Sequence, residues 1–242
     1  MSEEAHNADP MPFLFEEIDA RHQEVLKSTI TESSVDLKSL AYLYSLIKTV
    51  RPKNMLEIGL ATGSSATCHA LAALPTLSRF DIIDPMQGTL FDNVGLKNVR
   101  AVLSNSQEKL FFHLLPSYVA MTQLIETQIQ YDYIFIDGDH RFDATMVDVF
   151  LADKLLKVGG YVVIDDRPWP MIGGVIAFMR ENYRHMQADL RHPRLSTFRK
   201  LDIDRRQWFD FWHFNVPQDQ QMQDKIAACQ DARDRANREG DQ

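Results

Sequence analysis

The middle of the chain alternates short, apolar-rich runs with longer amphipathic segments. The short runs have the length of buried strands: Met55–Ile58, Arg79–Asp84, Val99–Leu103, Tyr131–Asp137 and Tyr161–Ile164. Because segments with helical periodicity separate these runs, the pattern predicts a parallel sheet with helices on both faces. The expected fold class is therefore α/β.

Helices are predicted where apolar residues recur every three or four positions. The clearest is Asp36–Val50, where Leu40, Leu43 and Ile47 share one face and Pro52 ends the helix. The others are Phe13–Ser28, Ser64–Leu74, Gln107–Leu115, Pro116–Gln130, Phe142–Leu156 and Ile172–Tyr183. Gly159 and Gly160 are expected to cap the helix at 142–156.

The alternation of strands and helices stops near the C-terminus. Leu195–Ile203 and Trp208–Val216 read as strands with only a polar turn between them. Such a pair predicts an antiparallel end to the sheet. Gln218–Gln242 is polar, with a thin apolar stripe, and is expected to be a marginal helix or a disordered tail.

Length and composition favour a single domain over residues 1–242. The chain has 242 residues, of which 45% are hydrophobic, enough for a substantial core. We expect a mobile N-terminus (1–12), N-terminal helices (13–50), an α/β core (51–217) and a polar C-terminal helix or tail (218–242). No apolar run is long enough for a membrane span, and the N-terminus lacks a secretory pattern.

Charge and cysteine usage narrow the expected setting. The net charge of −8 argues against a nucleic-acid partner, which would need lysine and arginine at its phosphates. The basic stretch His185–Arg206 is interpreted as a solvated surface. Cys68 and Cys229 lie far apart in the sequence, which favours free thiols and a cytoplasmic location.

A glycine-containing turn follows the first predicted strand. Asn54–Ser65 reads N-M-L-E-I-G-L-A-T-G-S-S, so Gly59 and Gly63 lie between a strand and a helix. Glycines allow a sharp turn and a close ligand, and the helix start offers N–H groups to that ligand. The spacing G-x-x-x-G is not the G-x-G-x-x-G of dinucleotide enzymes. The turn therefore suits a nucleotide-like ligand, although a tight turn needs glycine even without one.

Polar residues follow all five predicted strands, and three of these ends carry carboxylates. In a parallel sheet the carboxyl ends of the strands meet at one edge, where ligands bind. Asp84 can accept hydrogen bonds from a ribose diol, or can cap a helix before Pro85. Ser106 and Gln107, in the predicted turn after the third strand, can bond an adenine edge or cap the next helix.

The other two acidic ends point to a metal ion. Asp137, Asp165 and Asp166 would repel one another if they met unpaired, and Mg²⁺ or another divalent cation resolves that repulsion with oxygen ligands. His140 is three residues beyond Asp137 and can accept a proton. Asp139 is the competing base, and His140 can instead be a hydrogen-bonding loop residue.

With these residues in place, the chain resembles class I S-adenosylmethionine-dependent methyltransferases over roughly Asp36–Tyr183. Within them it is similar to the metal-dependent O-methyltransferases of macrolide and aminocoumarin sugars (methyltransferase family 24), and more distantly to catechol O-methyltransferases. The resemblance rests on L-E-I-G-L-A-T-G-S-S, I-I-D-P, F-I-D-G-D-H and L-L-K-V-G-G-Y-V-V-I-D-D. Catechol-type enzymes have Asn where this chain has Asp166.

The resemblance implies a Rossmann-like sheet of seven strands in the order 3-2-1-4-5-7-6, with strand seven antiparallel. It assigns S-adenosylmethionine to Glu57, Gly59, Ala61, Gly63, Ser64, Ser65, Asp84, Pro85, Ser106, Gln107 and Asp137. It assigns Mg²⁺ or another divalent cation to Asp137, Asp165 and Asp166. Either His140 or Asp139 would be the catalytic base.

The implied reaction moves a methyl group from the sulfonium to a hydroxyl oxygen of a small molecule, such as a sugar, natural product or phenol. Trp169, Trp208 and Trp212 could wall the acceptor or pack in the core. The N-terminal helices could support a homodimer. The alternatives are a non-catalytic cofactor-binding protein, a relative with different chemistry such as hydroxylation, and, least favoured, a nicotinamide-dependent oxidoreductase.

Overall fold

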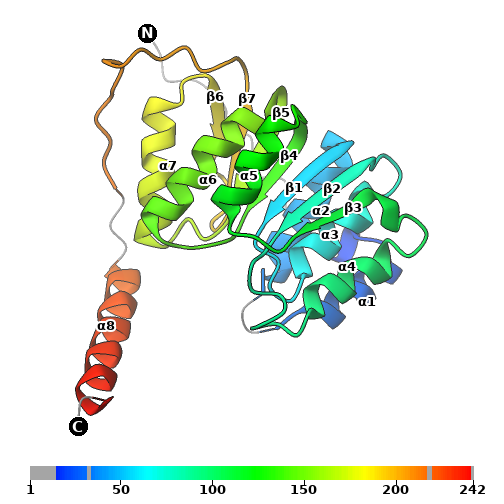
Figure 1. Ribbon diagram of the computed structural model, residues 1–242, viewed down its shortest axis with the longest axis horizontal. Coiled ribbons are helices and arrows are strands. Elements are labelled where there is room, and N and C mark those ends of the chain that lie inside the picture. Colours follow the sequence, from blue (N-terminus) through cyan, green and yellow to red (C-terminus); the bar gives the residue numbers. More distant parts are fainter. Residues whose placement is uncertain (1–14, 32–33, 217–219, 241–242) are drawn as a thin grey trace.

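The computed structural model describes residues 15–31, 34–216 and 220–240 and contains one seven-stranded sheet (Figure 1). The strand order is β3-β2-β1-β4-β5-β7-β6, and every neighbouring pair is parallel except the two that involve β7. The strands are β1 (Asn54–Ile58), β2 (Arg79–Ile83), β3 (Leu110–His113), β4 (Tyr131–Ile136), β5 (Leu156–Ile164), β6 (Met186–Asp189) and β7 (Ser196–Lys200). The α/β class and the strand order expected from the resemblance are confirmed. The prediction for residues 1–12 lies outside the described residues.

Two layers of helices cover the sheet. One layer consists of α1 (Ala20–Thr29), α2 (Leu37–Val50), α3 (Ser64–Ala73) and α4 (Val94–Val102). The other consists of α5 (Ser117–Glu126), α6 (Phe142–Leu155) and α7 (Pro170–Asn182). Figure 1 shows α5, α6 and α7 together on one side of the strands.

The two-residue period of the strands explains why both faces are covered. In β4, Tyr133 and Phe135 belong to the core under α1–α4, whereas Ile134 and Ile136 belong to the core under α5–α7. Successive side chains of a strand point to opposite faces. A strand that is apolar at every position therefore requires helices on both sides.

The N-terminal helix α2 contacts β7, near the antiparallel end of the sheet. Asp36 caps α2 by accepting hydrogen bonds from the N–H groups of Lys38 (2.8 Å) and Ser39 (2.9 Å). Further along α2, the Tyr42 hydroxyl lies 2.8 Å from Thr197 Oγ1 in β7. Instead of one helix over Phe13–Ser28, the described part has a 3₁₀ turn (η1, Phe15–Glu17) followed by α1.

The third predicted strand is wrong, and so is the helix predicted after it. Val99–Leu103 lies in and directly after α4, because Leu96, Val99 and Leu103 are buried at helical spacing. The true third strand is β3, within the predicted helix Gln107–Leu115, after a short 3₁₀ turn (η2, Gln107–Lys109). Both runs are short and apolar, so periodicity alone did not distinguish them.

The prediction that Gly159 and Gly160 cap α6 is also wrong. Both glycines lie inside β5, where the register with β4 shifts between Tyr131 and Tyr133. Gly159 has φ 89°, and a Cβ on Gly160 would meet Asp132 O at 3.1 Å. The glycines therefore form a bulge in the strand.

An antiparallel pair ends the sheet, but it is not the predicted one. β7 lies within the predicted Leu195–Ile203 run, and its partners are β5 and β6. Trp208–Val216 forms no strand; Trp212 instead exchanges two 2.9 Å hydrogen bonds with the side-chain amide of Asn182 at the end of α7. The segment around Trp212 therefore pairs with the end of α7 and not with a strand.

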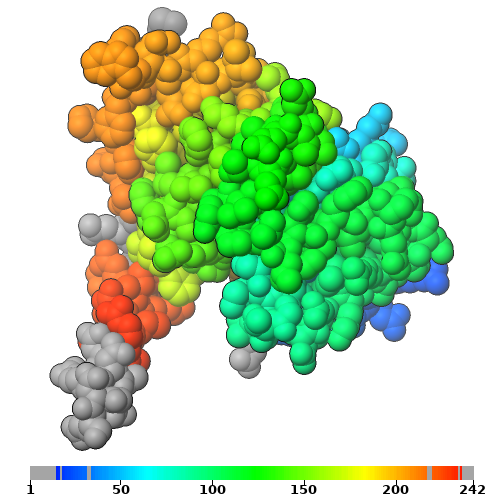
Figure 2. All heavy atoms as spheres, in the orientation of Figure 1, coloured from blue at the N-terminus to red at the C-terminus, as the bar shows by residue number. Residues whose placement is uncertain are grey.

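The C-terminal segment is helical over Gln220–Gly240 (α8). Figure 1 and Figure 2 show α8 projecting away from the layered body, beyond the segment that follows β7. Of the two predicted states, the described residues therefore adopt the helix. Among those residues, no helix combines the length and apolarity that a membrane span requires.

Candidate active site

The turn between β1 and α3 has the two positive φ angles expected of its glycines. Gly59 has φ 88°, and a Cβ there would lie 1.9 Å from the carbonyl oxygen of Asp137. Gly63 has φ 83°, and its Cβ would lie 2.8 Å from the carbonyl oxygen of Gly95. The neighbouring backbone therefore requires both glycines, whatever ligand the turn holds.

Glu57 and Ser65, both predicted to bind the cofactor, have protein partners beneath this turn. Glu57 is fully buried and accepts hydrogen bonds from Ser65 Oγ (2.6 Å) and His69 Nδ1 (2.7 Å). On the other side of its ring, His69 Nε2 lies 3.0 Å from the Tyr133 hydroxyl. Glu57 and Ser65 thus join β1, α3 and β4 inside the core.

Asp84 supports the turn from the end of β2. Its Oδ2 accepts the N–H groups of Leu60 and Ala61, both at 3.0 Å, and its Oδ1 accepts the Met86 N–H at 2.7 Å. Gln87, which sequence reasoning missed, donates to Asp84 Oδ2 (3.0 Å) and to Ala61 O (2.7 Å). Asp84 and Gln87 together hold the glycine turn in place.

Ser106 and Gln107 lie at the wrong edge of the sheet for the predicted adenine contact. They precede β3, which runs parallel to β2, so they lie where the strands begin. The misplaced third strand is the cause of this error. Leu114–Ser117 is the segment that follows the carboxyl end of β3.

Three polar side chains come together beyond β4 and β5. His140 Nε2 lies 3.4 Å from Asp137 Oδ1 and 2.9 Å from Asp166 Oδ2. A donor atom from each of the three lies within 4.8 Å of the others. Asp166 has φ 56°, a left-handed conformation that costs a non-glycine residue energy and often occurs at functional sites.

Asp165, the third predicted metal ligand, has a different partner. Its side chain is fully buried, and its two oxygens accept hydrogen bonds from Arg194 Nε (2.6 Å) and Nη2 (2.7 Å). The same guanidinium lies 3.2 Å from Asp166 Oδ1. Arg194 belongs to the stretch interpreted as solvated surface, and that interpretation is wrong for this residue.

The electrostatics of the cluster reflect its crowding. Burial, with the negative charge of Asp165 next, raises the pKa of Asp137 to about 7. Hydrogen bonds to Asp137 and then to Asp166 raise the pKa of His140 to about 10. The raised pKa of Asp137 opposes a further negative charge beside Asp165, whereas the raised pKa of His140 favours a positive charge between two carboxylates.

Asp139 lies at the rim of this cluster. Both of its oxygens are within hydrogen-bond distance of Arg141 Nε, at 3.1 and 2.9 Å, and its side chain is largely exposed. These hydrogen bonds lower the pKa of Asp139. Neither of the two predicted bases is therefore without a partner.

The residues present fit a divalent cation. Asp137 and Asp166 supply carboxylate oxygens, His140 supplies an imidazole nitrogen, and their spacing admits one ion. Carboxylates brought this close need a cation or a proton between them. Asp165 contributes negative charge nearby, with its oxygens already engaged.

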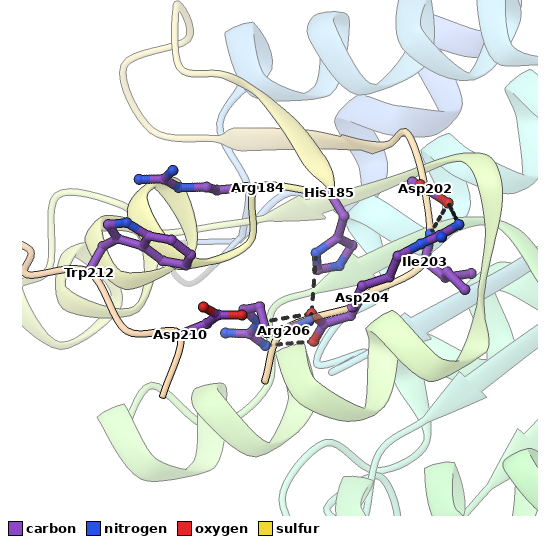
Figure 3. A pocket seen from close by; sticks show the side chains of 9 residues that line it. Arg184, His185, Asp202, Ile203, Asp204, Arg206, Asp210 and Trp212 are labelled. Carbon is purple, nitrogen blue, oxygen red and sulfur yellow. Dashed lines mark hydrogen bonds and ion pairs between the residues drawn. The ribbon is translucent and has the colours of Figure 1, made fainter. Parts of the chain in front are cut away.

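A cavity lies elsewhere, near the edge where the strands begin (Figure 3). It measures about 340 Å³ and lies beside His185, which precedes β6, and beyond the end of antiparallel β7. Trp212 lines this cavity, and Trp208 is 93% exposed, so neither walls the acidic cluster. Trp169 does lie at the carboxyl edge, directly before α7.

A second acidic and histidine cluster contributes His185 and Asp204 to the wall of this cavity. Asp153 Oδ1 accepts hydrogen bonds from His185 Nε2 and pairs with Lys200 Nζ, both at 3.0 Å. Asp204 pairs with Arg206 at 2.7 Å and faces His185 Nδ1 at 3.9 Å. Each carboxylate of this cluster thus has its own Lys or Arg partner.

Part of the chain is similar in sequence to known methyltransferases. Residues 56–167 match a family model described as a methyltransferase domain. The chain is 31% identical over 160 residues to tapetum-specific methyltransferase 1 of Arabidopsis thaliana, and 27% identical over 149 residues to a caffeoyl-CoA O-methyltransferase of Stellaria longipes. These matches cover 66% and 57% of this chain, and 65% and 58% of the relatives, less than two thirds of either relative.

Solved structures agree on the fold. The O-methyltransferase TomG of Streptomyces achromogenes, solved with SAM, superposes with a TM-score of 0.61 at 16% identity, covering 76% of this chain and 91% of TomG. An O-methyltransferase of Bacillus cereus, solved with SAH, gives 0.57 at 19%, covering 75% and 91%. The chain is thus similar in sequence to a methyltransferase domain over residues 56–167, and similar in fold to solved O-methyltransferases.

Proposed function

We propose that this chain transfers a methyl group from S-adenosylmethionine to a hydroxyl oxygen of a small molecule, assisted by a divalent cation. One observation carries the proposal: the glycine turn after β1 and the acidic cluster after β4 and β5 share one edge of a methyltransferase-domain sheet. That edge is where ligands bind in parallel α/β sheets. The name of the caffeoyl-CoA O-methyltransferase supports a small hydroxylated acceptor. In this proposal residues 1–242 form a single domain, with the catalytic α/β core at 51–217.

The cofactor would lie along the glycine turn. Gly63 at the start of α3 gives that helix no side-chain cap, so its first N–H groups suit the carboxylate of the methionine moiety. Asp84 Oδ1 accepts one described hydrogen bond, from Met86, and retains capacity for a ribose hydroxyl. Leu114–Ser117, at the carboxyl end of β3, replaces Ser106 and Gln107 as the segment nearest the adenine.

The acceptor hydroxyl would approach the acidic cluster. A divalent cation held there supplies Lewis-acid chemistry, which lowers the pKa of the hydroxyl and orients it. The protein itself must align oxygen, methyl carbon and sulfur, and such alignment is worth about 7–11 kcal/mol of barrier. His140 and Asp139 remain the two candidates for the base, and comparing His140→Ala with Asp139→Ala tests which one is needed.

The test combines cofactor binding with product detection. Calorimetric titration with S-adenosylmethionine should show binding, and a panel of hydroxylated sugars and phenols should yield S-adenosylhomocysteine and a methylated product detected by mass spectrometry. Failure to bind the cofactor would reject the proposal. Binding without turnover over a broad panel would favour the non-catalytic alternative, and full activity in EDTA would remove the cation from the mechanism.

A further inference from the structure

Two amide side chains donate hydrogen bonds to consecutive carbonyl groups of the glycine turn. Gln87 Nε2 donates to the Ala61 carbonyl oxygen at 2.7 Å, and Asn98 Nδ2 donates to the Thr62 carbonyl oxygen at 2.9 Å. Gln87 follows β2 and Asn98 lies on α4, so both amides come from the segment between β2 and β3. This segment therefore binds the acceptors of the turn.

The start of α4 lies directly against the turn. A Cβ on Gly95, in the first turn of α4, would collide with the Ala61 carbonyl oxygen and would lie 2.8 Å from Leu60 Cγ. Glycine is required at this position because the two backbones approach too closely for any side chain. This close approach brings the amide of Asn98, one helical turn further on, within reach of the turn.

The partners of Gln87 determine which way its amide points. Its Nε2 lies within hydrogen-bond distance of two acceptors, Ala61 O and Asp84 Oδ2, and its Oε1 accepts the Leu96 N–H at 3.4 Å. The side chain is fully buried, so water cannot replace these partners. A reversed amide would place its oxygen against two acceptors. Gln87 therefore acts on the turn as a donor.

Pairing both carbonyls leaves the turn with a surface of N–H donors. The helix α3 that follows begins at Gly63 without a side-chain cap, so its first N–H groups are available to a ligand. An unpaired carbonyl beside a bound carboxylate would be left without water and without a donor, which costs free energy. With the carbonyls of Ala61 and Thr62 engaged by amides, the turn suits an anionic group better.

We propose that Gln87 and Asn98 are positioning residues for the cofactor, because they bind two carbonyls of the turn and leave its N–H groups to the carboxylate of S-adenosylmethionine. The inference rests on the proposed function, since it concerns the same cofactor. The two residues differ in reach. Gln87 also donates to Asp84, which faces the ribose in the proposal, whereas the described hydrogen-bond partner of the Asn98 side chain is Thr62.

The experiment titrates the full chain with two nucleosides by calorimetry. S-adenosylhomocysteine carries the carboxylate, whereas 5′-methylthioadenosine has the same adenosine and sulfur without the amino acid part. Asn98→Leu keeps the side-chain size and removes the amide. It should weaken S-adenosylhomocysteine by about tenfold, because the freed carbonyl loses its water when the ligand covers the turn. The affinity for methylthioadenosine should change by less than about twofold. Gln87→Met should weaken both nucleosides, since Asp84 loses a donor as well.

Asn54 provides a matched control at the amino edge of the sheet. Its Nδ2 donates to the Gln130 carbonyl oxygen at 3.1 Å from the first residue of β1. Asn54→Leu removes the same kind of hydrogen bond and should leave the affinity for both nucleosides unchanged. Where circular dichroism shows that Gln87→Met does not fold, Asn98→Leu decides the inference, because Asn98 is only half-buried and its replacement disturbs the core less.

Three results would overturn the inference: an unchanged affinity for S-adenosylhomocysteine in Asn98→Leu, equal losses for the two nucleosides in that variant, or an equal loss in Asn54→Leu. A wild-type protein that does not bind S-adenosylhomocysteine would reject the proposed function, and this inference with it. Normal binding by the wild-type protein together with any of the three results would reject this inference alone.

Discussion

An aspartate, a histidine and a second aspartate come together at both edges of the sheet. At the carboxyl edge they are Asp137, His140 and Asp166, and at the amino edge they are Asp153, His185 and Asp204. Residue types alone therefore do not distinguish a reaction centre from a structural cluster.

The balance of fixed charge does distinguish them. At the amino edge, Asp153 pairs with Lys200 and Asp204 pairs with Arg206, so each carboxylate has its own cation. At the carboxyl edge, Arg194 and His140, whose raised pKa keeps it protonated, face three carboxylates, so the described contacts leave one negative charge without a partner. Negative charge left over after protein partners are counted needs a ligand, whereas a balanced cluster only holds segments together.

The largest expected effect is on the rate of methyl transfer in Asp166→Asn. The variant removes one charge from the unbalanced cluster without changing its size. We expect the rate of S-adenosylhomocysteine formation to fall by about 10⁴-fold, because Lewis-acid assistance and acceptor alignment are lost together. A steady-state assay at saturating cofactor measures this.

The matched variant at the amino edge is Asp204→Asn, which should leave the same rate within about twofold, since its site lies at the other end of the strands. Equal losses of rate in Asp166→Asn and Asp204→Asn would show that the two edges do not differ in their role in the reaction.

The amino edge should respond in stability instead. Asp153 is buried and pairs with both His185 and Lys200. The Lys200 side chain is only 8% exposed. Asp153→Ala leaves a buried ammonium without its carboxylate, which should lower the free energy of unfolding by about 3–5 kcal/mol. Urea unfolding followed by circular dichroism measures the change.

Asp143, exposed in the first turn of the same helix, is the control. Asp143→Ala should cost less than about 1 kcal/mol, the usual size of a helix-dipole interaction. An Asp153→Ala protein as stable as Asp143→Ala would show that the amino-edge cluster does not hold its segments together.

Much of the carboxyl edge could be predicted from the sequence, because it depends on local order. Gly59, Asp84, Asp137 and Asp166 each follow a strand, and parallel strands bring such ends to one edge. Asp137 and Asp166 meet for that reason, so the order of the strands along the chain is enough to predict that they lie close together.

Contacts that depend on register or on long-range return of the chain could not be predicted. Arg194 reaches Asp165 only because the chain comes back along β7 antiparallel to β5, 29 residues later. Leu110–His113 was missed because a four-residue apolar strand carries no more periodicity than the nearby end of α4. The contact between Glu57 and His69 could not be predicted, because His69 lies on the following helix, inside the core.

Asp148 is a further buried carboxylate, and it has no Lys or Arg partner among the described residues. Asp148 on α6 is 1% exposed, and neither oxygen has a hydrogen-bond partner among the described residues. Burial raises the pKa of Asp148 to about 6. The folded state thus binds a proton more tightly than the unfolded state, so its stabilising effect is present at low pH and is lost as pH rises through about 6.

Asp148→Asn removes this pH dependence. One pKa unit corresponds to about 1.4 kcal/mol, so a rise from 3.8 to about 6 corresponds to about 3 kcal/mol above pH 7. The variant should gain up to that much stability at pH 7.5 and little at pH 4. Urea unfolding of both proteins across this range gives the difference, and a difference independent of pH would mean that Asp148 is ionised and solvated or paired in solution.

The smallest expected effect is that of Asp36→Ala. This variant tests whether an aspartate that caps a helix also contributes to the cation site. The oxygens of Asp36 accept hydrogen bonds from Lys38 and Ser39, so its role is to cap α2. Asp36→Ala should lower the free energy of unfolding by about 1 kcal/mol, and Asp36→Ser should recover most of it, because serine also caps helices. Metal affinity should not change in either variant. If serine restores stability but not metal affinity, the charge of Asp36 contributes to the cation site, and Asp36 does more than cap α2.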